Sequence, residues 1–169
     1  MITDPEQRGR ALAAFFFEIE PRLFADLEES GLLDSAAGGA QRTGRRREWE
    51  CFALYACVRG LVAAGGFNRE TARAIDALHE DVLSSWQSEA TDAESFETRR
   101  ARVSERYAEY GAIGQEGGAS GAATVTARLG EAAARHLAGP EAPAELIALV
   151  GGAHEALAEG SAEAVKRAQ

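Results

Sequence analysis

Residues 51–64 read CFALYACVRGLVAA, and this stretch decides the fold because Arg59 is its one charged residue. Wound at 100° per residue, the segment and the preceding Trp49 present two opposed apolar sides. The bulky side carries Cys51, Leu54, Tyr55, Val58, Leu61 and Val62, and the opposite side carries Trp49, Ala53, Ala56, Gly60 and Ala63. A helix that is apolar on both sides has neighbours all round it. We therefore expect a central buried helix over about residues 46–64.

This central run is too short to span a bilayer. A transmembrane helix needs about 20 apolar residues, whereas the run has 14. The sequence therefore predicts a buried core helix and no association with a membrane.

Helical signals also mark the segments on either side. Asp4-Pro5-Glu6 has the order of a helix start, with an Asp cap followed by Pro in the first turn. Pro21 interrupts the periodic pattern of this first helix and predicts a kink or a restart there. Asn68 is placed to cap a later helix, and residues 91–94 resemble a capping box. A separate short helix is expected from Ser161.

The chain as a whole is predicted to be all-α. No window shows the sustained alternation of a strand, so we expect a single domain over residues 1–169, a bundle of five or six helices. Two segments rich in small or polar residues, about 34–44 and 111–121, are expected to be flexible connections.

Composition limits the classes of function. Eighteen basic residues against 27 acidic ones give a net charge of −9, which disfavours binding to nucleic acid. Lys166 is the single lysine, and this preference for arginine, with abundant Ala and Gly, indicates a bacterial source. Cys51 and Cys57 lie six residues apart on one helix and cannot pair. Together these features predict a cytoplasmic protein.

Arg59 is the residue on which a ligand site would depend. A guanidinium inside an apolar helix needs a partner, because burying it alone costs several kcal/mol. An internal carboxylate is the favoured partner, and the candidates are Asp76, Glu80 and Glu109. The alternative partner is an anionic ligand, in a pocket walled by Tyr55, Trp49, His79 and Tyr107.

A second candidate surface lies further along the chain. Residues 94–110 are predicted to form a helix with a narrow apolar seam among charged residues. The seam and its flank comprise Phe96, Arg100, Val103, Tyr107 and Tyr110. Aromatic and arginine side chains are enriched in protein interfaces, so the seam suits either a partner helix or the edge of the core. The small side of the central helix is likewise open to a homodimer partner or to a neighbour in the same chain.

Two other kinds of site have weaker support. Residues 66–75 resemble the turn and recognition helix of bacterial repressors, which predicts DNA binding around residues 58–77. However, the preceding helix is long and buried, and the acids at positions 76, 80 and 81 would repel phosphate. The three histidines lack the paired Glu-x-x-His spacing of a di-metal bundle. We therefore expect no metal and no cofactor.

These observations predict a non-enzymatic protein-interaction or adaptor module that binds a protein partner or a second copy. The first alternative is a bundle that binds an anionic ligand, or acts as an enzyme, through Arg59 and His79. The second alternative is DNA binding by a helix-turn-helix around residues 58–77. What faces Arg59 in the folded chain is the observation that bears most directly on these three.

Overall fold

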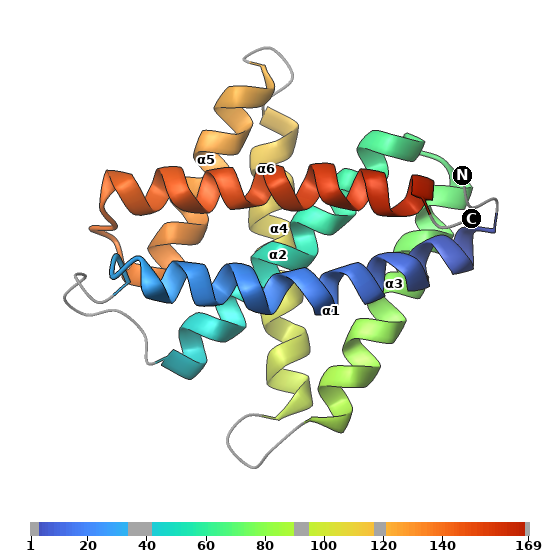
Figure 1. The fold of residues 1–169 in the computed structure, drawn as a ribbon, viewed down its shortest axis with the longest axis horizontal. Helices are drawn as coiled ribbons and strands as arrows, with labels where there is room; N and C mark the ends of the chain where they lie inside the picture. Colours follow the sequence, from blue (N-terminus) through green and yellow to red (C-terminus); the bar gives the residue numbers. More distant parts are fainter. Residues whose placement is uncertain (1–3, 34–41, 90–94, 117–120, 168–169) are drawn as a thin grey trace.

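The computed structural model describes residues 4–33, 42–89, 95–116 and 121–167, and within these ranges the chain forms six helices and no strand. The helices are α1 Pro5–Glu29, α2 Arg42–Gly65, α3 Arg69–Ser88, α4 Phe96–Glu116, α5 Ala122–Ala138 and α6 Ala144–Arg167 (Figure 1). The prediction of an all-α bundle of five or six helices is confirmed. None of the described helices combines the length and the apolar character needed to cross a membrane.

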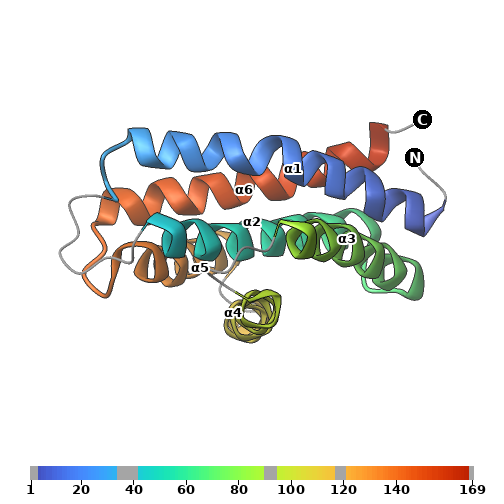
Figure 2. The ribbon, with the colours of Figure 1, turned by 90° about the horizontal axis from the view of Figure 1, so that it is seen from below.

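The helices form three layers around α2. Figure 2 shows α1 and α6 side by side as one layer, with α2, α3 and α5 in the layer beneath them. Helix α4 crosses under this second layer and is seen nearly end-on. Because α2 packs against all the other helices, the prediction of a central helix is confirmed.

The small side of α2 is covered by α6. Ala53 and Ala56 are fully buried, and a Cβ atom on Gly60 would overlap the carbonyl oxygen of Ala158. Glycine is therefore required at position 60, because the α6 backbone occupies the space of a side chain. The partner of this small-residue side is a neighbouring helix of the same chain. This side of α2 is therefore not exposed to a homodimer partner.

Helix starts follow the predicted chemistry with one change. Asp4 accepts from the backbone N–H of Glu6 at 3.1 Å, and Asn68 accepts from the N–H of Thr71 at 2.9 Å. Both caps are confirmed. The predicted capping box at 91–94 lies outside the described residues, and Ser95 caps α4 instead by accepting from the N–H of Thr98 at 3.2 Å.

Two predicted breaks do not divide the helices in which they lie. Helix α1 runs without a restart through Pro21. Helix α6 continues through Ser161 to Arg167, where a separate helix was expected. The Ser161 hydroxyl is buried and donates to the Leu157 carbonyl at 2.6 Å, so packing against α2 extends the helix past the small residues that favoured a break.

The predicted connections are also shorter than expected. Residues 42–44 form the first turn of α2 and residues 111–116 the last turns of α4, while 34–41 and 117–120 lie outside the described residues. Helix α4 continues because Ile113 packs against the core. A Cβ on Gly114 would lie 3.3 Å from the Tyr55 hydroxyl, so a small residue suits this position. Tertiary contact here outweighs the low helix propensity of glycine.

A buried carboxylate on α2 gathers three arginines. Glu50 accepts from Arg47 at 3.0 Å and from Arg46 at 3.3 Å, both on α2. It also accepts from Arg99 of α4 at 2.7 Å. The Arg99 guanidinium lies 3.9 Å from the ring centre of Trp86 on α3. One carboxylate thus joins α2 to α4 and, through the stacked ring, to α3.

A second ion-pair cluster joins the same two helices. Glu48 accepts from Arg106 at 2.6 Å and 3.1 Å, the bidentate geometry that a planar guanidinium favours. Arg102 lies 3.3 Å from the same carboxylate. Ion pairs therefore fix the long crossing helix α4 against α2.

The close contact of α2 with α6 gives a matched pair of substitutions. Gly60→Ala should lower the free energy of unfolding by about 1–3 kcal/mol, because the added methyl pushes the two backbones apart. Gly152→Ala, in α6 with open space around its Cβ position, should raise it by about 0.5–1 kcal/mol through helix propensity. Urea unfolding of the two variants measures both values. Equal effects would mean that α2 and α6 are not in close contact.

Candidate functional site

The bulky side of α2 is left partly uncovered at its C-terminal half, where it borders a groove of about 580 Å³. The walls come from α2, from the turn after it and from the end of α4. We call this cavity the Arg59 groove; its lining residues are Tyr55, Val58, Arg59, Val62, Ala63, Phe67, Gly111, Gly114 and Gln115. The glycines of α4 have no side chains to fill the space over α2, which explains why the groove exists.

Arg59 is the charged group of the groove, and its partner is a histidine. Its Nη1 lies 2.9 Å from Nε2 of His154 on α6. In the described part of the chain Arg59 has no carboxylate partner, so the expectation of a pair with Asp76, Glu80 or Glu109 is wrong. Glu109 instead lies 2.7 Å from His136. The internal partner of Arg59 therefore does not neutralise its charge.

His154 is held in its neutral form. Burial, and secondarily the charge of Arg59, lowers its pKa to about 3. The ring lies between aromatic neighbours, 4.9 Å from Phe52 and 6.3 Å from Tyr55 between ring centres. Because Arg59 donates to Nε2, we assign the proton to Nδ1, which is buried and finds no hydrogen-bond partner among the described residues. A neutral imidazole thus orients the guanidinium by accepting one hydrogen bond.

The predicted ligand residues separate into three groups. Arg59 and Tyr55 line the groove, and the Tyr55 hydroxyl donates to the Tyr110 carbonyl at 3.0 Å. Tyr107 lies behind Tyr55, with ring centres 5.4 Å apart. The Tyr107 hydroxyl lies 2.9 Å from Nε2 of His79, whose pKa is lowered by burial.

Trp49, the remaining predicted wall, lies elsewhere. It is fully buried, and its indole N–H donates to the Glu20 carbonyl of α1 at 3.2 Å. Ten residues of helix separate Trp49 from Arg59, which places them about 15 Å apart along the axis.

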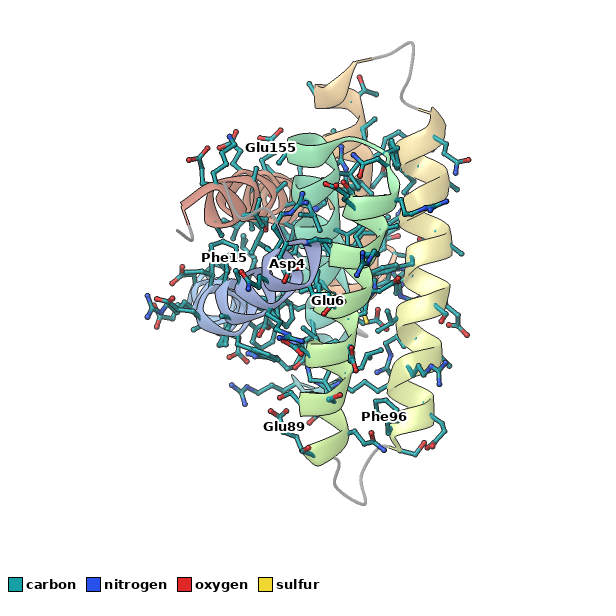
Figure 3. The ribbon with its side chains drawn as sticks, turned by 90° about the vertical axis from the view of Figure 1, so that its right-hand side faces the viewer. Asp4, Glu6, Phe15, Glu89, Phe96 and Glu155 are labelled. Atoms are coloured by element: carbon teal, nitrogen blue, oxygen red, sulfur yellow. The ribbon has the colours of Figure 1, made fainter. Side chains whose placement is uncertain are left out.

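Most of the predicted interface seam faces inward. Val103 and Tyr110 are buried, and Tyr107 packs against the core from a half-buried position. Arg100 is exposed and Phe96 is half-buried at the start of α4, toward the end of α3 that carries Glu89 (Figure 3). The inward-facing residues offer little surface to a partner, so core packing accounts for the middle of the seam.

The thiols lack the features of nucleophiles. Burial raises the pKa of both Cys51 and Cys57 to about 12, so neither forms a thiolate near neutral pH. No group of three or more metal-ligating side chains occurs among the described residues. Helix α2, before the predicted DNA-reading turn, has 24 residues, unlike the short first helix of that motif.

Sequence reasoning missed the apolar side of the groove. Phe67 is 95% exposed, and the sequence contained one indication of this exposure. An apolar residue just before a helix cap usually packs against the fourth residue of the helix. That residue here is Ala72, which is too small to cover a phenyl ring.

No protein-family model matches the chain, and neither a curated protein nor a solved structure matches it. Function is therefore inferred from the geometry of the groove itself.

The state of His154 predicts a pH dependence of stability. Between its ordinary pKa of 6.5 and the folded value of about 3, the unfolded chain binds a proton that the folded chain does not. Stability from this group is therefore lost as pH falls through that window. His154→Gln keeps an acceptor for Arg59 without titrating, so between about pH 7.5 and 5 it should lose about 2 kcal/mol less than the parent.

Urea unfolding at these two pH values measures the difference. Above about pH 7.5 the two proteins should show parallel profiles, because the histidine is neutral in both states. Identical losses on acidification would contradict the assignment of a neutral, buried His154.

Proposed function

We propose that the protein is a non-catalytic binding module whose Arg59 groove holds a small amphiphilic anion, a carboxylate with an apolar chain or ring. One observation carries the proposal: a guanidinium at an apolar groove has a neutral histidine, and no carboxylate, as its partner in the described part of the chain. The charge of Arg59 is therefore available to an acid supplied from outside.

The donors of Arg59 suit a carboxylate. Its Nη1 is taken by His154, while Nε and Nη2 make no hydrogen bond with another described group. A guanidinium edge with two donors matches the two oxygens of a carboxylate. Because the surrounding walls are apolar, the attraction is less screened than it would be on an open surface.

The walls suit the rest of such a ligand. Val58, Val62 and Ala63 provide an apolar floor along α2, and Phe67 stands at the rim. The volume of about 580 Å³ falls within the roughly 300–1,000 Å³ of small-molecule sites. Catalysis has less support, because His154 remains neutral down to a pH of about 3 and so does not exchange protons near neutral pH.

Titration with decanoate tests the charge and the apolar body separately. Decanoate should bind, and decanol, with the same chain but no charge, should bind more weakly. Arg59→Met should weaken decanoate about 10- to 100-fold, the usual value of a hydrogen bond to a charged group, and should leave decanol unchanged. Isothermal titration calorimetry measures the affinities.

Arg22→Met is the matched control. Arg22 is exposed on α1 and pairs with Glu18 at 3.4 Å, so its loss changes the net charge equally without touching the groove. If decanoate binding is weakened equally in both variants, the effect comes from the overall charge of the protein and not from the groove. Absence of decanoate binding to the parent protein, or equal binding of decanol, would reject the proposal.

A protein contact through the same face is the second candidate, favoured by the nearly complete exposure of Phe67. An exposed phenyl beside an apolar groove is self-complementary, as a two-fold dimer requires. The mass in light scattering should then rise with concentration, and Phe67→Ser should abolish the rise. A mass that stays monomeric at every concentration would exclude self-association.

A further inference from the structure

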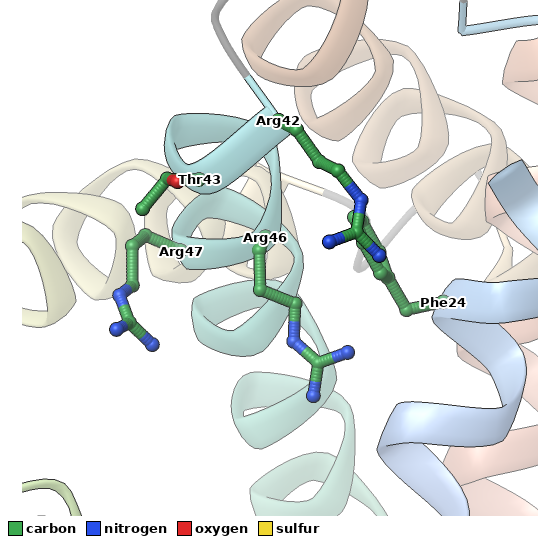
Figure 4. A pocket seen from close by; sticks show the side chains of 5 residues that line it. All are labelled: Phe24, Arg42, Thr43, Arg46 and Arg47. Atoms are coloured by element: carbon green, nitrogen blue, oxygen red, sulfur yellow. The ribbon is translucent and has the colours of Figure 1, made fainter. Parts of the chain in front are cut away.

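A second cavity, of about 270 Å³, lies between α1 and the first turns of α2. It is lined by Phe24, Arg42, Thr43, Arg46 and Arg47, and we call it the arginine pocket. Figure 4 shows the three arginine side chains running in the same direction along α2, with those of Arg42 and Arg46 on the side of Phe24. The Arg46 guanidinium lies 5.0 Å from the Phe24 ring centre.

The guanidiniums around the arginine pocket share a small set of carboxylates. Arg42 pairs with Glu28 at 2.5 Å and 2.8 Å. Arg46 pairs with Glu20 at 2.7 Å and with Glu50 at 3.3 Å. Glu50 is shared further with Arg47 and Arg99. Among the described residues, the carboxylates of Glu28, Glu20 and Glu50 thus pair with the arginines of the pocket, and Glu50 is shared with Arg99 outside it.

The state of Glu20 weakens the pairing of Arg46. The side chain is 3% exposed, and burial raises its pKa to about 7 against the opposing attraction of Arg46. The neighbouring charges are Arg46, Glu50, Arg99 and Arg47. Near neutral pH Glu20 is protonated part of the time, and Arg46 then lacks one of its two counter-charges.

Unused donors remain on two of the guanidiniums that line the pocket. Arg42 and Arg46 each bond through Nε and Nη2, and in the described part of the chain neither Nη1 has a hydrogen-bond partner. A guanidinium carries five N–H donors, and arginine is the residue that recognises phosphate oxygens by paired hydrogen bonds. Thr43 adds a hydroxyl to the lining.

We propose that the arginine pocket is a binding site for the phosphate group of a small phosphorylated ligand, separate from the Arg59 groove. The size supports a small ligand, because about 270 Å³ is below the volume of most drug-sized sites. The net charge of −9 disfavours a nucleic acid, whose many phosphates would meet the acidic surface.

Titration calorimetry at matched ionic strength tests the site, with pyrophosphate, inorganic phosphate and glycerol 3-phosphate as probes and sodium chloride as the reference. Pyrophosphate should bind, and Arg42→Gln should weaken it about five- to tenfold. Arg42→Lys keeps the charge but loses the paired donors, so its affinity for pyrophosphate should lie between that of the parent protein and that of Arg42→Gln. If glycerol 3-phosphate binds more tightly than inorganic phosphate, the site is assigned to a phosphate ester. If inorganic phosphate binds more tightly, the site is assigned to the free anion.

Arg42 is chosen because its side chain is 79% exposed, so its loss leaves the core intact; circular dichroism and the melting temperature without ligand verify the fold. Arg22→Gln is the matched control and should bind pyrophosphate as the parent does. Arg59→Met should also leave it unchanged, which separates this site from the groove.

Three results would overturn the proposal. One is absence of pyrophosphate binding to the parent protein. Another is equal weakening in Arg22→Gln, which would reveal a general charge effect. The third is a double-stranded oligonucleotide that binds through Arg42 more tightly than pyrophosphate, which would assign these arginines to a nucleic-acid surface.

Discussion

The ion pair between Glu50 and Arg99 holds α4 in its place, and both candidate sites depend on it. Helix α4 crosses α2 and contributes few residues to the apolar core, among them Val103 and Tyr110. Besides aromatic packing against Phe52 and Tyr55, it is joined to α2 by the charged clusters at Glu50 and Glu48. Such a network is stable when every member is satisfied, because a buried charge without its partner costs several kcal/mol. The same Glu50 also orders the guanidiniums of the arginine pocket.

The apolar pattern of residues 51–64 was sufficient to predict the central helix of an all-α bundle. Two opposed apolar sides require neighbours on both, and α6 and α4 supply them. The errors fell where local chemistry competes with packing. Pro21, Gly114 and Ser161 all favour a break by intrinsic propensity, yet each lies in a helix that its neighbours stabilise. A single sequence does not contain the positions of those neighbours.

The candidate site was predicted in part, and for a physical reason. A lone arginine in an apolar helix has to find a partner, which made Arg59 recognisable from the sequence. Its partner His154 lies 95 residues away and carries no charge, so a search for acids could not find it. The groove itself depends on the absence of side chains at Gly111 and Gly114. These two glycines predict a groove only when it is known that α4 crosses α2 at this point.

The two faces of α2 differ in how they respond to heat. Toward α6 the contact is close and apolar at Gly60, whereas toward α4 the ion pairs of Glu48 and Glu50 add to the aromatic packing. The cost of removing charges from water falls as temperature rises, while the apolar contribution per unit area levels off. As the temperature rises, the contact with α4 should therefore contribute a larger share of the stability relative to the contact with α6. The two sides of α2 are held by contacts whose strengths change differently with temperature.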